Sequence, residues 1–231
     1  MNMAESYGQF CPVAMAAEIF CTRWTPLILR ELAAGSTRFN DLKRGVPRIS
    51  PTLLSKRLKQ LEEAGVIERV RSADDAPEYR LTPAGNDLKT VVFGLGFWGQ
   101  RWIEAQSSLK NLDPSLLMWD MRRNLNPTPL PQPRCVIQIV YPELKQGQRH
   151  WWLVIENGET DLCKVDPGFD VDLYISTDLR TMTAVWMGLT TVRSEIDAGR
   201  MHITGNDGVK HAINQWLGLS PFAVEKKLVN A

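Results

Sequence analysis

The sequence predicts an α+β protein with two domains, and three observations support this fold class. The first part of the chain places apolar residues at helical spacing and then alternates them in two short strand-like runs. Prolines at positions 127, 129, 131 and 133 follow, in a segment that cannot continue a helix. Beyond them, runs rich in β-branched and aromatic residues precede further helical patterns, which predicts a mostly antiparallel sheet covered on one side by helices.

The composition is that of an ordinary globular protein, and it excludes several classes of site. The chain has 231 residues, of which 44% are hydrophobic and 23% charged, and a formal net charge of +1. No run is long and apolar enough to span a bilayer, and the N-terminus lacks the order of a signal peptide, so we expect a cytoplasmic protein that does not bind membranes. The cysteines lack CxxC spacing, the three histidines lack ligand spacing, and we find no phosphate-binding or nucleophile motif. We therefore expect no metal, no cofactor and no enzyme.

The first part begins with three predicted helices, at residues 12–20, 24–34 and 39–44. In the second of them, Leu27, Ile28 and Leu32 are expected to face inward. Gly35 follows directly and is placed to end this helix, because glycine adopts the left-handed conformation of a helix C-terminus without strain.

A fourth helix is predicted to begin at Ser50, which has the right side chain for an N-cap, with Pro51 at the first helical position. Its buried stripe consists of leucines spaced i, i+4 and i+7, and the helix ends at Gly65. These leucines are Leu54, Leu58 and Leu61. The opposite face is polar and carries Thr52, Ser55, Lys56, Lys59 and Gln60.

A β-hairpin and a long helix are predicted next. Residues 66–72 and 77–83 form two short strand-like runs, joined by the acidic, turn-forming sequence ADDAP. A hairpin directly behind a helix-turn-helix is a wing. The long helix begins at Pro83 and carries large apolar residues every three or four positions, namely Leu88, Val92, Leu95, Trp98 and Trp102. Another helix is predicted from Pro114.

The segment from Arg38 to Lys59 concentrates positive charge that the whole chain lacks. It holds seven basic residues and one acidic residue, Asp41, so a polyanion is the first partner to consider. An α-helix fits the major groove of DNA, and only the face opposite the leucines can reach base edges. The candidate base-reading residues are therefore Thr52, Ser55, Lys56 and Lys59. The remaining DNA-binding candidates are Arg38, Lys43, Arg44, Arg48, Ser50 and Arg57 on the helix-turn-helix, and Arg69, Arg71 and Arg80 on the wing.

A solvated helix face would carry the same lysines and arginines, but the wing and the cap favour DNA contact. A longer series of residues adds to this, in fixed order and spacing: Cys11-Pro12, Trp24-Thr25, the ILREL stretch, Gly35, Arg38-Phe39, Leu42, Ile49-Ser50, Leu54, Arg57-Leu58, Leu61-Glu62, Gly65, Arg69, Tyr79, Leu81-Thr82 and Gly85. The series resembles the HxlR-type family of bacterial winged helix-turn-helix regulators. The resemblance implies a homodimer, paired through terminal helices, that binds double-stranded DNA at a pseudo-palindromic operator. Trp98 and Trp102 fit such a pairing surface, although packing within one subunit would also explain them.

Cys11 is a candidate redox site, because some members of that family resemble thiol sensors with a cysteine near this position. A reactive thiol needs exposure and a lowered pKa, and the flanking residues Phe10, Pro12 and Val13 supply no basic group. Cysteine is also among the residues most often buried. A structural role for Cys11 is therefore the preferred interpretation.

The second part is predicted to contain strands and then mostly helices. The strands lie at residues 135–141, 149–158, 159–165 and 171–177, with Asn157-Gly158 as a hairpin turn. Helical patterns at 178–189 and 190–199, a strand at 200–205 and a final helix at 206–219 follow.

Three segments of the second part follow one another in the same order as in a known fold. They are PGFDVDLYISTDLRTMTAVWMG, the two-helix stretch after it, and IDAGRMHITGN before the last helix. Over about residues 134–220 they resemble the sterol-carrier-protein type two fold. The resemblance implies a hydrophobic tunnel for a lipid or another small apolar molecule. Its lining would come from Trp151, Leu153, Leu173, Ile175, Met182, Val185, Trp186, Leu189, Ile213 and Trp216. The same residues would also suit a closed core, but eight tryptophans in the chain favour a pocket.

These patterns predict a winged helix-turn-helix domain with a dimerisation helix at 1–105, a helical and proline-rich linker at 106–133, and a sterol-carrier-like ligand-sensing domain at 134–225. The predicted function is a dimeric, sequence-specific transcriptional regulator whose second domain binds a small apolar ligand. Two alternatives stay open. The second domain could be a ligand-free dimerisation or partner module, with thiol control at Cys11. The chain could also be a lipid-binding protein that does not bind DNA, in which the basic cluster only neutralises an acidic surface.

Overall fold

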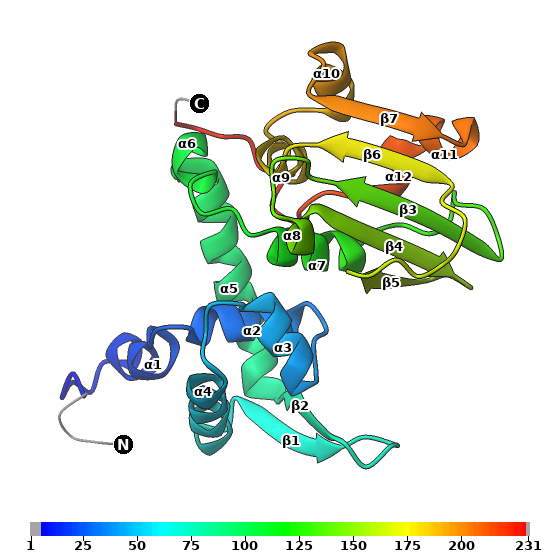
Figure 1. Ribbon diagram of the computed structural model, residues 1–231. Helices are drawn as coiled ribbons and strands as arrows, with labels where there is room; N and C mark the ends of the chain where they lie inside the picture. The colour runs from blue at the N-terminus through cyan, green and yellow to red at the C-terminus, as the bar shows by residue number, and fades with distance from the viewer. Residues whose placement is uncertain (1–5, 230–231) are drawn as a thin grey trace. The chain divides into compact units, whose positions relative to one another are not determined.

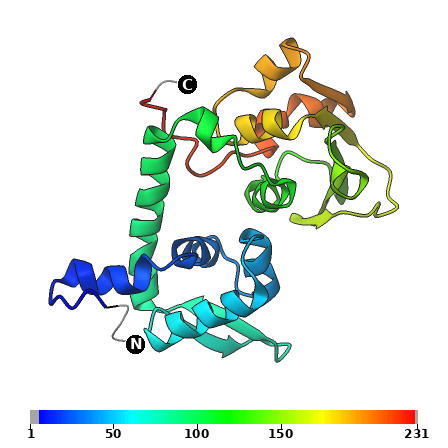
Figure 2. The same cartoon turned by 60° about the vertical axis from the view of Figure 1, so that its left-hand side comes forward.

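The computed structural model describes residues 6–229 and contains two compact units, Met1–Gly96 and Phe97–Ala231 (Figure 1). The boundary between them falls inside helix α5 (Pro83–Trp102), which runs unbroken for 20 residues in spite of its glycines (Figure 2). The boundary between the two units therefore precedes residues 106–133, the segment in which the sequence predicts a linker. Each unit has a hydrophobic core of its own.

The first unit consists of helices followed by a hairpin, in the predicted order. Its helices are α1 (Pro12–Phe20), α2 (Thr25–Ala33), α3 (Phe39–Gly45), α4 (Pro51–Glu63) and the first part of α5. The strands β1 (Ile67–Arg71) and β2 (Pro77–Leu81) pair antiparallel, with Ile67 opposite Leu81 and Arg71 opposite Pro77. The predicted wing is therefore confirmed.

The core of the first unit is built from one face of each helix and the base of the hairpin. The leucine stripe of α4 is fully buried, as predicted. In α2, Ile28, Leu29 and Leu32 are buried, whereas Leu27 is 40% exposed. The prediction that Leu27 faces inward is wrong, because positions i, i+1 and i+4 form one arc of a helix and Leu27 lies at its edge.

The second unit combines a sheet with short helices. After the end of α5, its helices are α6 (Ala105–Ser108), α7 (Pro114–Asn124), α8 (Gln146–Arg149), α9 (Leu179–Trp186), α10 (Val192–Asp197), α11 (Asp207–His211) and α12 (Ile213–Trp216). The strands are β3 (Arg134–Val140), β4 (His150–Glu156), β5 (Glu159–Cys163), β6 (Leu173–Thr177) and β7 (Met201–Gly205). Within the described residues they form a five-stranded sheet in the order β5-β4-β3-β6-β7.

Most neighbours in this sheet are antiparallel, but β3 and β6 are parallel, with Ile137 opposite Leu173. The prediction of a mostly antiparallel sheet is therefore confirmed, with this one parallel pair as the exception. The chain leaves β5 at one edge of the sheet and crosses to the free side of β3, and such a crossover makes the two strands parallel.

Helices cover one face of the sheet, as predicted (Figure 1). Cys135, Ile137 and Ile139 of β3 point into a core that residues of α7, α9 and α12 complete. On the opposite face, Trp152 and two valines of β3 and β4 pack against Val171 in the segment before β6. Both faces of β4 and most of β3 are therefore buried.

The segment predicted as a linker, residues 106–133, is part of this second core. Leu117, Met118 and Met121 of α7 are at most 5% exposed, and Leu125 and Leu130 after the helix are also buried. The prolines prevent the helix from continuing and lead the chain into β3. They mark a turn inside the second unit, because the apolar residues before and between them pack against the sheet.

Candidate nucleic-acid interface

Helix α4 presents a polar face that the first unit leaves uncovered. The hydroxyl oxygen of Ser50 caps the helix and accepts a hydrogen bond from the amide of Leu53 at 3.2 Å. Because the leucines occupy one side, the polar side chains lie on the other. All four predicted base-reading residues are exposed there, namely Thr52, Ser55, Lys56 and Lys59.

A buried carboxylate holds α3 against α2 and so fixes where the turn into α4 begins. Glu31 is fully buried and accepts hydrogen bonds from Arg30 Nη2 at 2.8 Å and from the Ser36 hydroxyl at 3.3 Å. Arg30 also donates to the carbonyl of Gly45, at the end of α3, at 2.8 Å. A Cβ atom added at Gly45 would lie 1.8 Å from Glu31 Oε2, so only glycine leaves room for the carboxylate.

Two predicted DNA contacts, Lys43 and Arg57, bond to carbonyl groups of the first unit. Lys43 is half-buried and donates to the carbonyl of Pro47 at 2.7 Å. Arg57 is also half-buried and donates to the carbonyl of Arg23 at 3.2 Å and to the Gln60 side chain at 2.6 Å. These bonds hold the turn after α3 and tie α4 to the turn between α1 and α2. The prediction from charge alone missed this use of both residues.

Arg38, just before α3, and the wing arginines Arg71 and Arg80 are paired with acidic residues of the hairpin. The ion pairs are Arg38–Asp74 at 2.9 Å, Arg71–Asp75 at 2.6 Å and Arg80–Glu78 at 2.9 Å. Hydrogen bonds from Ser72 and then from Arg38 hold the pKa of Asp74 below its usual value. The three arginine side chains remain about half exposed or more, so solvent weakens each pair.

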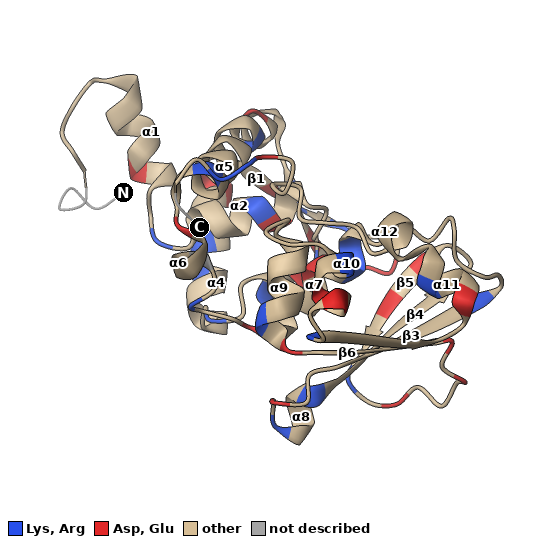
Figure 3. Cartoon of the chain, turned by 90° about the horizontal axis from the view of Figure 1, so that it is seen from above, with Lys and Arg blue, Asp and Glu red and all other residues tan. Residues whose placement is uncertain are grey.

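The other basic residues predicted for this surface are exposed. Arg44 pairs with Asp41 at 3.0 Å, and Lys59 lies 3.7 Å from the carboxylate of Glu63. Over residues 6–229, the exposed side chains of Arg48, Lys56 and Arg69 make no ion pair. Figure 3 colours the basic residues of α4 and the hairpin blue. Positive charge without a carboxylate partner thus lies in the turn before α4, on α4 itself and on β1.

Cys11 is only partly buried and stands at the N-cap of α1. The nearby backbone amides of Ala14 and Val13 lower the pKa of its thiol. Cys135, by contrast, is buried, and desolvation raises its pKa to about 12. The prediction weighed only side-chain neighbours of Cys11. It therefore missed the amides that a helix N-terminus presents.

The residues predicted to line an apolar pocket mostly fill the core of the second unit. Nine of the ten are at most 6% exposed and belong to one packed cluster: Trp151, Leu153, Leu173, Ile175, Met182, Val185, Trp186, Ile213 and Trp216. Leu189 is the one of the ten that lines the cavity of about 720 Å³ in the second unit. Polar and charged side chains form much of the cavity wall, and no periodic pattern in the sequence marks them.

Residues 6–229 contain neither a metal-binding cluster nor a membrane-spanning helix. No group of three or more His, Cys, Asp and Glu side chains in that range could hold a metal ion. None of the helices in that range has both the length and the hydropathy needed to cross a membrane.

The first unit is similar to known proteins along most of its length. The family model of the HxlR-like helix-turn-helix matches residues 19–107. The HTH-type transcriptional regulator YvaP of Bacillus subtilis is 34% identical over 106 residues, which are 45% of this chain and 95% of that protein. The regulator sll1512 of Synechocystis is 33% identical over 102 residues, 43% of this chain and 76% of that protein. The solved structure of the reduced transcriptional regulator YodB from B. subtilis is 30% identical over 40% of this chain and 93% of that chain, with a TM-score of 0.35.

These relatives are named as regulators of transcription, in agreement with the prediction that the chain is not an enzyme. The matched residues include α2, α3, α4 and the wing, which together build the surface described above. Regulators with a helix-turn-helix act by binding DNA, so family membership implies DNA binding here. The chain belongs to the HxlR-like helix-turn-helix family of transcriptional regulators.

Proposed function

We propose that the protein is a sequence-specific regulator in which α4 reads bases in the major groove and the wing contacts the flanking backbone. The exposed polar face of α4 is the observation that carries this proposal. The hydroxyl groups of Thr52 and Ser55 can donate to or accept from base edges, and Lys56 can reach guanine acceptors. Arg48 and Arg69, which have no carboxylate partner among the described residues, suit phosphate groups. Lys43 and Arg57 act by positioning the helices.

Two substitutions separate base reading from phosphate binding. Ser55→Ala should lower the preference for the operator over variants with one changed base pair, because that base loses a hydrogen-bond partner. Arg48→Ala should weaken binding to all sequences alike and reduce the slope of log affinity against log salt by about 1. The measurement is fluorescence anisotropy of the full chain at several salt concentrations, with an operator selected from random DNA.

The matched control is Arg193→Ala, which removes one exposed positive charge from the second unit. It should change neither the preference for the operator nor the slope of log affinity against log salt. Equal effects of Ser55→Ala and Arg48→Ala on base preference would contradict the division into readers and phosphate contacts. A full chain that prefers no sequence in the selection would contradict the proposed function itself.

The homodimer is proposed to form through α5. Val91, Leu95, Trp98 and Trp102 recur at i, i+4, i+7 and i+11, which is one face of a helix, and each is between 47% and 55% exposed. Large apolar side chains in an exposed row favour a partner surface. Their exposure also argues against the alternative in which both tryptophans pack within one subunit.

Leu95→Glu should convert the dimer to a monomer, since it places a charge in the proposed apolar contact. Sedimentation velocity of the full chain measures the change. Val165→Glu adds the same charge at an exposed apolar residue outside α5 and should leave the mass unchanged. A native protein that sediments as a monomer at micromolar concentration would rule the dimer out.

The second unit is proposed to sense a small molecule, and its α+β sheet with helices on one face supports the likeness to the sterol-carrier type two fold. The ligand would have to favour one spacing of the two recognition helices, since equal affinity for both states shifts nothing. Half-sites one turn apart require a spacing of about 34 Å. Because the predicted tunnel residues are packed in the core, the proposed place for the ligand is the cavity beside Leu189.

Thiol control at Cys11 is a second candidate mechanism, favoured by its partial exposure and lowered pKa. In the folded chain, iodoacetamide at neutral pH should alkylate Cys11 much faster than Cys135, whose thiol is buried and has a raised pKa. Mass spectrometry of timed samples measures both rates. If the oxidant diamide lowers operator affinity equally in the native chain and in Cys11→Ser, control through Cys11 is excluded.

A further inference from the structure

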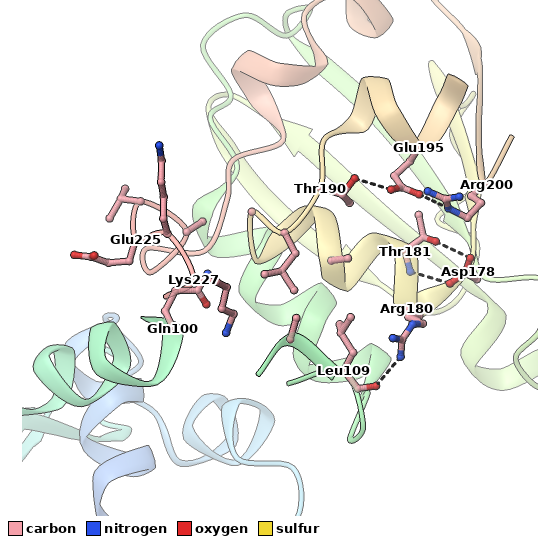
Figure 4. A pocket seen from close by; sticks show the side chains of 17 residues that line it. Gln100, Leu109, Asp178, Arg180, Thr181, Thr190, Glu195, Arg200, Glu225 and Lys227 are labelled. Carbon is pink, nitrogen blue, oxygen red and sulfur yellow. Dashed lines mark hydrogen bonds and ion pairs between the residues drawn. The ribbon is translucent and has the colours of Figure 1, made fainter. Parts of the chain in front are cut away.

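The cavity of the second unit is bounded by the end of α5, by α6, α9 and α10, and by the segment after residue 220 (Figure 4). Its volume of about 720 Å³ falls within the usual range of small-molecule sites. Apolar side chains form one part of its wall, among them Ala105, Leu109, Ala184, Leu189 and Ala223. The rest of the wall is polar and charged.

Most polar groups of the wall are already saturated by bonds within the protein. Asp178 accepts hydrogen bonds from the amide and the hydroxyl of Thr181, at 2.8 and 2.7 Å. Glu195 is 3% exposed and accepts from Arg200 Nε at 2.5 Å and from the hydroxyl of Thr190 at 2.6 Å. The bond from Arg200 lowers the pKa of Glu195, so this carboxylate stays ionised and holds Arg200. These groups have little capacity left for a ligand.

Three cations of the wall, Arg180, Lys226 and Lys227, have no carboxylate partner among residues 6–229. Arg180 donates to the carbonyl of Leu109 at 3.4 Å and to the side chain of Gln106 at 3.3 Å, which are long bonds to neutral oxygens. Lys227 donates to the carbonyl of Ile103 at 2.6 Å. Figure 4 shows Arg180 and Lys227 on opposite sides of the cavity. A guanidinium has five N–H donors, so Arg180 has most of its donors left for a ligand.

The segment that carries Lys227 is a fixed wall of the second unit. The amide of Ser220 donates to the carbonyl of Trp186 at 2.8 Å. The ring of Phe222 packs edge-on against Phe97, with 5.5 Å between the ring centroids. Burial also lowers the pKa of Lys227, which is the effect of holding an ammonium group close to apolar atoms.

We propose that this cavity binds a small organic carboxylate with an apolar body. The guanidinium of Arg180 pairs with the carboxylate in fork geometry, the apolar body lies against Leu109 and Leu189, and Lys227 adds positive potential from the other side. The inference rests on the proposal that the second unit binds a small molecule, and it replaces the uncharged apolar ligand with an anionic one.

Octanoate and octanamide are matched probes, because they share a hydrocarbon chain and differ in charge. Isothermal titration calorimetry of the full chain should give about tenfold or more higher affinity for octanoate, as expected for charge-assisted hydrogen bonds. 4-Phenylbutyrate and its amide form a second pair with an aromatic body, and the same preference is expected. Arg180→Gln should remove the preference for the carboxylate, and Lys227→Gln should reduce it less.

Three controls keep the test interpretable. Lys210→Gln removes an exposed charge of α11 outside the cavity wall and should leave the affinities unchanged. Thermal unfolding without a probe shows whether each variant is folded. Should Arg180→Gln not fold, Arg180→Lys, which keeps the charge but not the fork, should bind octanoate with intermediate affinity.

Equal affinity for octanoate and octanamide would overturn the anionic ligand. Failure of both carboxylates to bind, or undiminished binding to a folded Arg180→Gln variant, would overturn the proposal as well. Operator binding is measured in the same samples. If it persists while the carboxylates fail, only this inference is lost, whereas loss of operator preference would remove the proposed function.

Discussion

Helix α4 and the sheet of the second unit differ in how many of their faces the protein buries. Helix α4 buries its leucines on one side and leaves the opposite side to solvent, so a partner can be recognised by the helix itself. Strands β3 and β4 of the sheet are covered on both faces, by helices on one and by the Trp152 cluster on the other. The side chains of these strands contact other residues of the protein and are therefore not available to a partner. In the second unit, the groups left for a partner therefore lie in the helices and the C-terminal segment beside the sheet.

The largest loss of stability is expected at Trp216, in the core that packs against the sheet. This residue is fully buried in the second core, and its indole Nε1 donates to the carbonyl of Val209 at 2.8 Å. Trp216→Ala should lower the free energy of unfolding by about 3–5 kcal/mol, the usual cost of truncating a buried large aromatic residue. Urea unfolding followed by circular dichroism measures it.

Leu189→Ala is the matched control, because Leu189 lines the cavity and is only partly buried. It should change stability much less and weaken octanoate binding. If Trp216→Ala leaves stability intact and abolishes ligand binding, Trp216 lines a tunnel and the comparison between the two regions fails.

A smaller loss of stability is expected at Gly45, where the backbone of the first unit packs against a buried carboxylate. Gly45→Ala should destabilise the protein by about 1–3 kcal/mol, the usual range for overpacking, because the new methyl group would collide with Glu31. Operator affinity should fall too, because the turn into α4 moves. Thermal unfolding and anisotropy measure the two effects. Gly147→Ala, at a glycine with no atom within 4 Å of its added Cβ, should be harmless, and equal losses at both glycines would refute the tight packing.

The smallest effect is expected in the wing, at Asp74. Asp74→Asn removes the closer of the two ion-pair contacts of Arg38 and leaves the one with Glu78 at 3.9 Å, so binding to all DNA sequences should tighten a few-fold at low salt. The gain should fade as salt rises, because the pair is exposed and already screened. Asp170→Asn makes the same charge change in the second unit and serves as the control in the anisotropy assay. An unchanged affinity for Asp74→Asn would show that Arg38 does not contact DNA.

The parts of the fold that local chemistry decides could be predicted from the sequence. The cap at Ser50, the leucine stripe of α4 and the hairpin around ADDAP each depend on neighbouring residues, and each is present in the structure. Non-local geometry could not be predicted in this way. The parallel pairing of β3 with β6 depends on where a crossover returns, and the burial of α7 depends on the sheet that it meets.

The same difference between local and non-local contacts explains which features of the candidate sites could be predicted. Exposure of Thr52, Ser55, Lys56 and Lys59 follows from the period of one helix. The bonds of Lys43 and Arg57 to backbone carbonyls, and the pairing of Arg38 with Asp74, join groups from different elements. The cavity joins Arg180 and Lys227, which are 47 positions apart, without any periodic pattern.

The exposed apolar residues of α5 form one row only because the helix continues without a break through its glycines. A residue inserted after Gly96 would rotate the later residues of α5 by about 100° around the helix axis relative to the earlier ones and shift them by about 1.5 Å. Val91 and Leu95 would then face one direction, and Trp98 and Trp102 another. Loop tips tolerate such insertions, whereas here a single added residue would put the two halves of the apolar row out of phase. The apolar row of α5 therefore depends on the number of residues in the helix as much as on the side chains that form it.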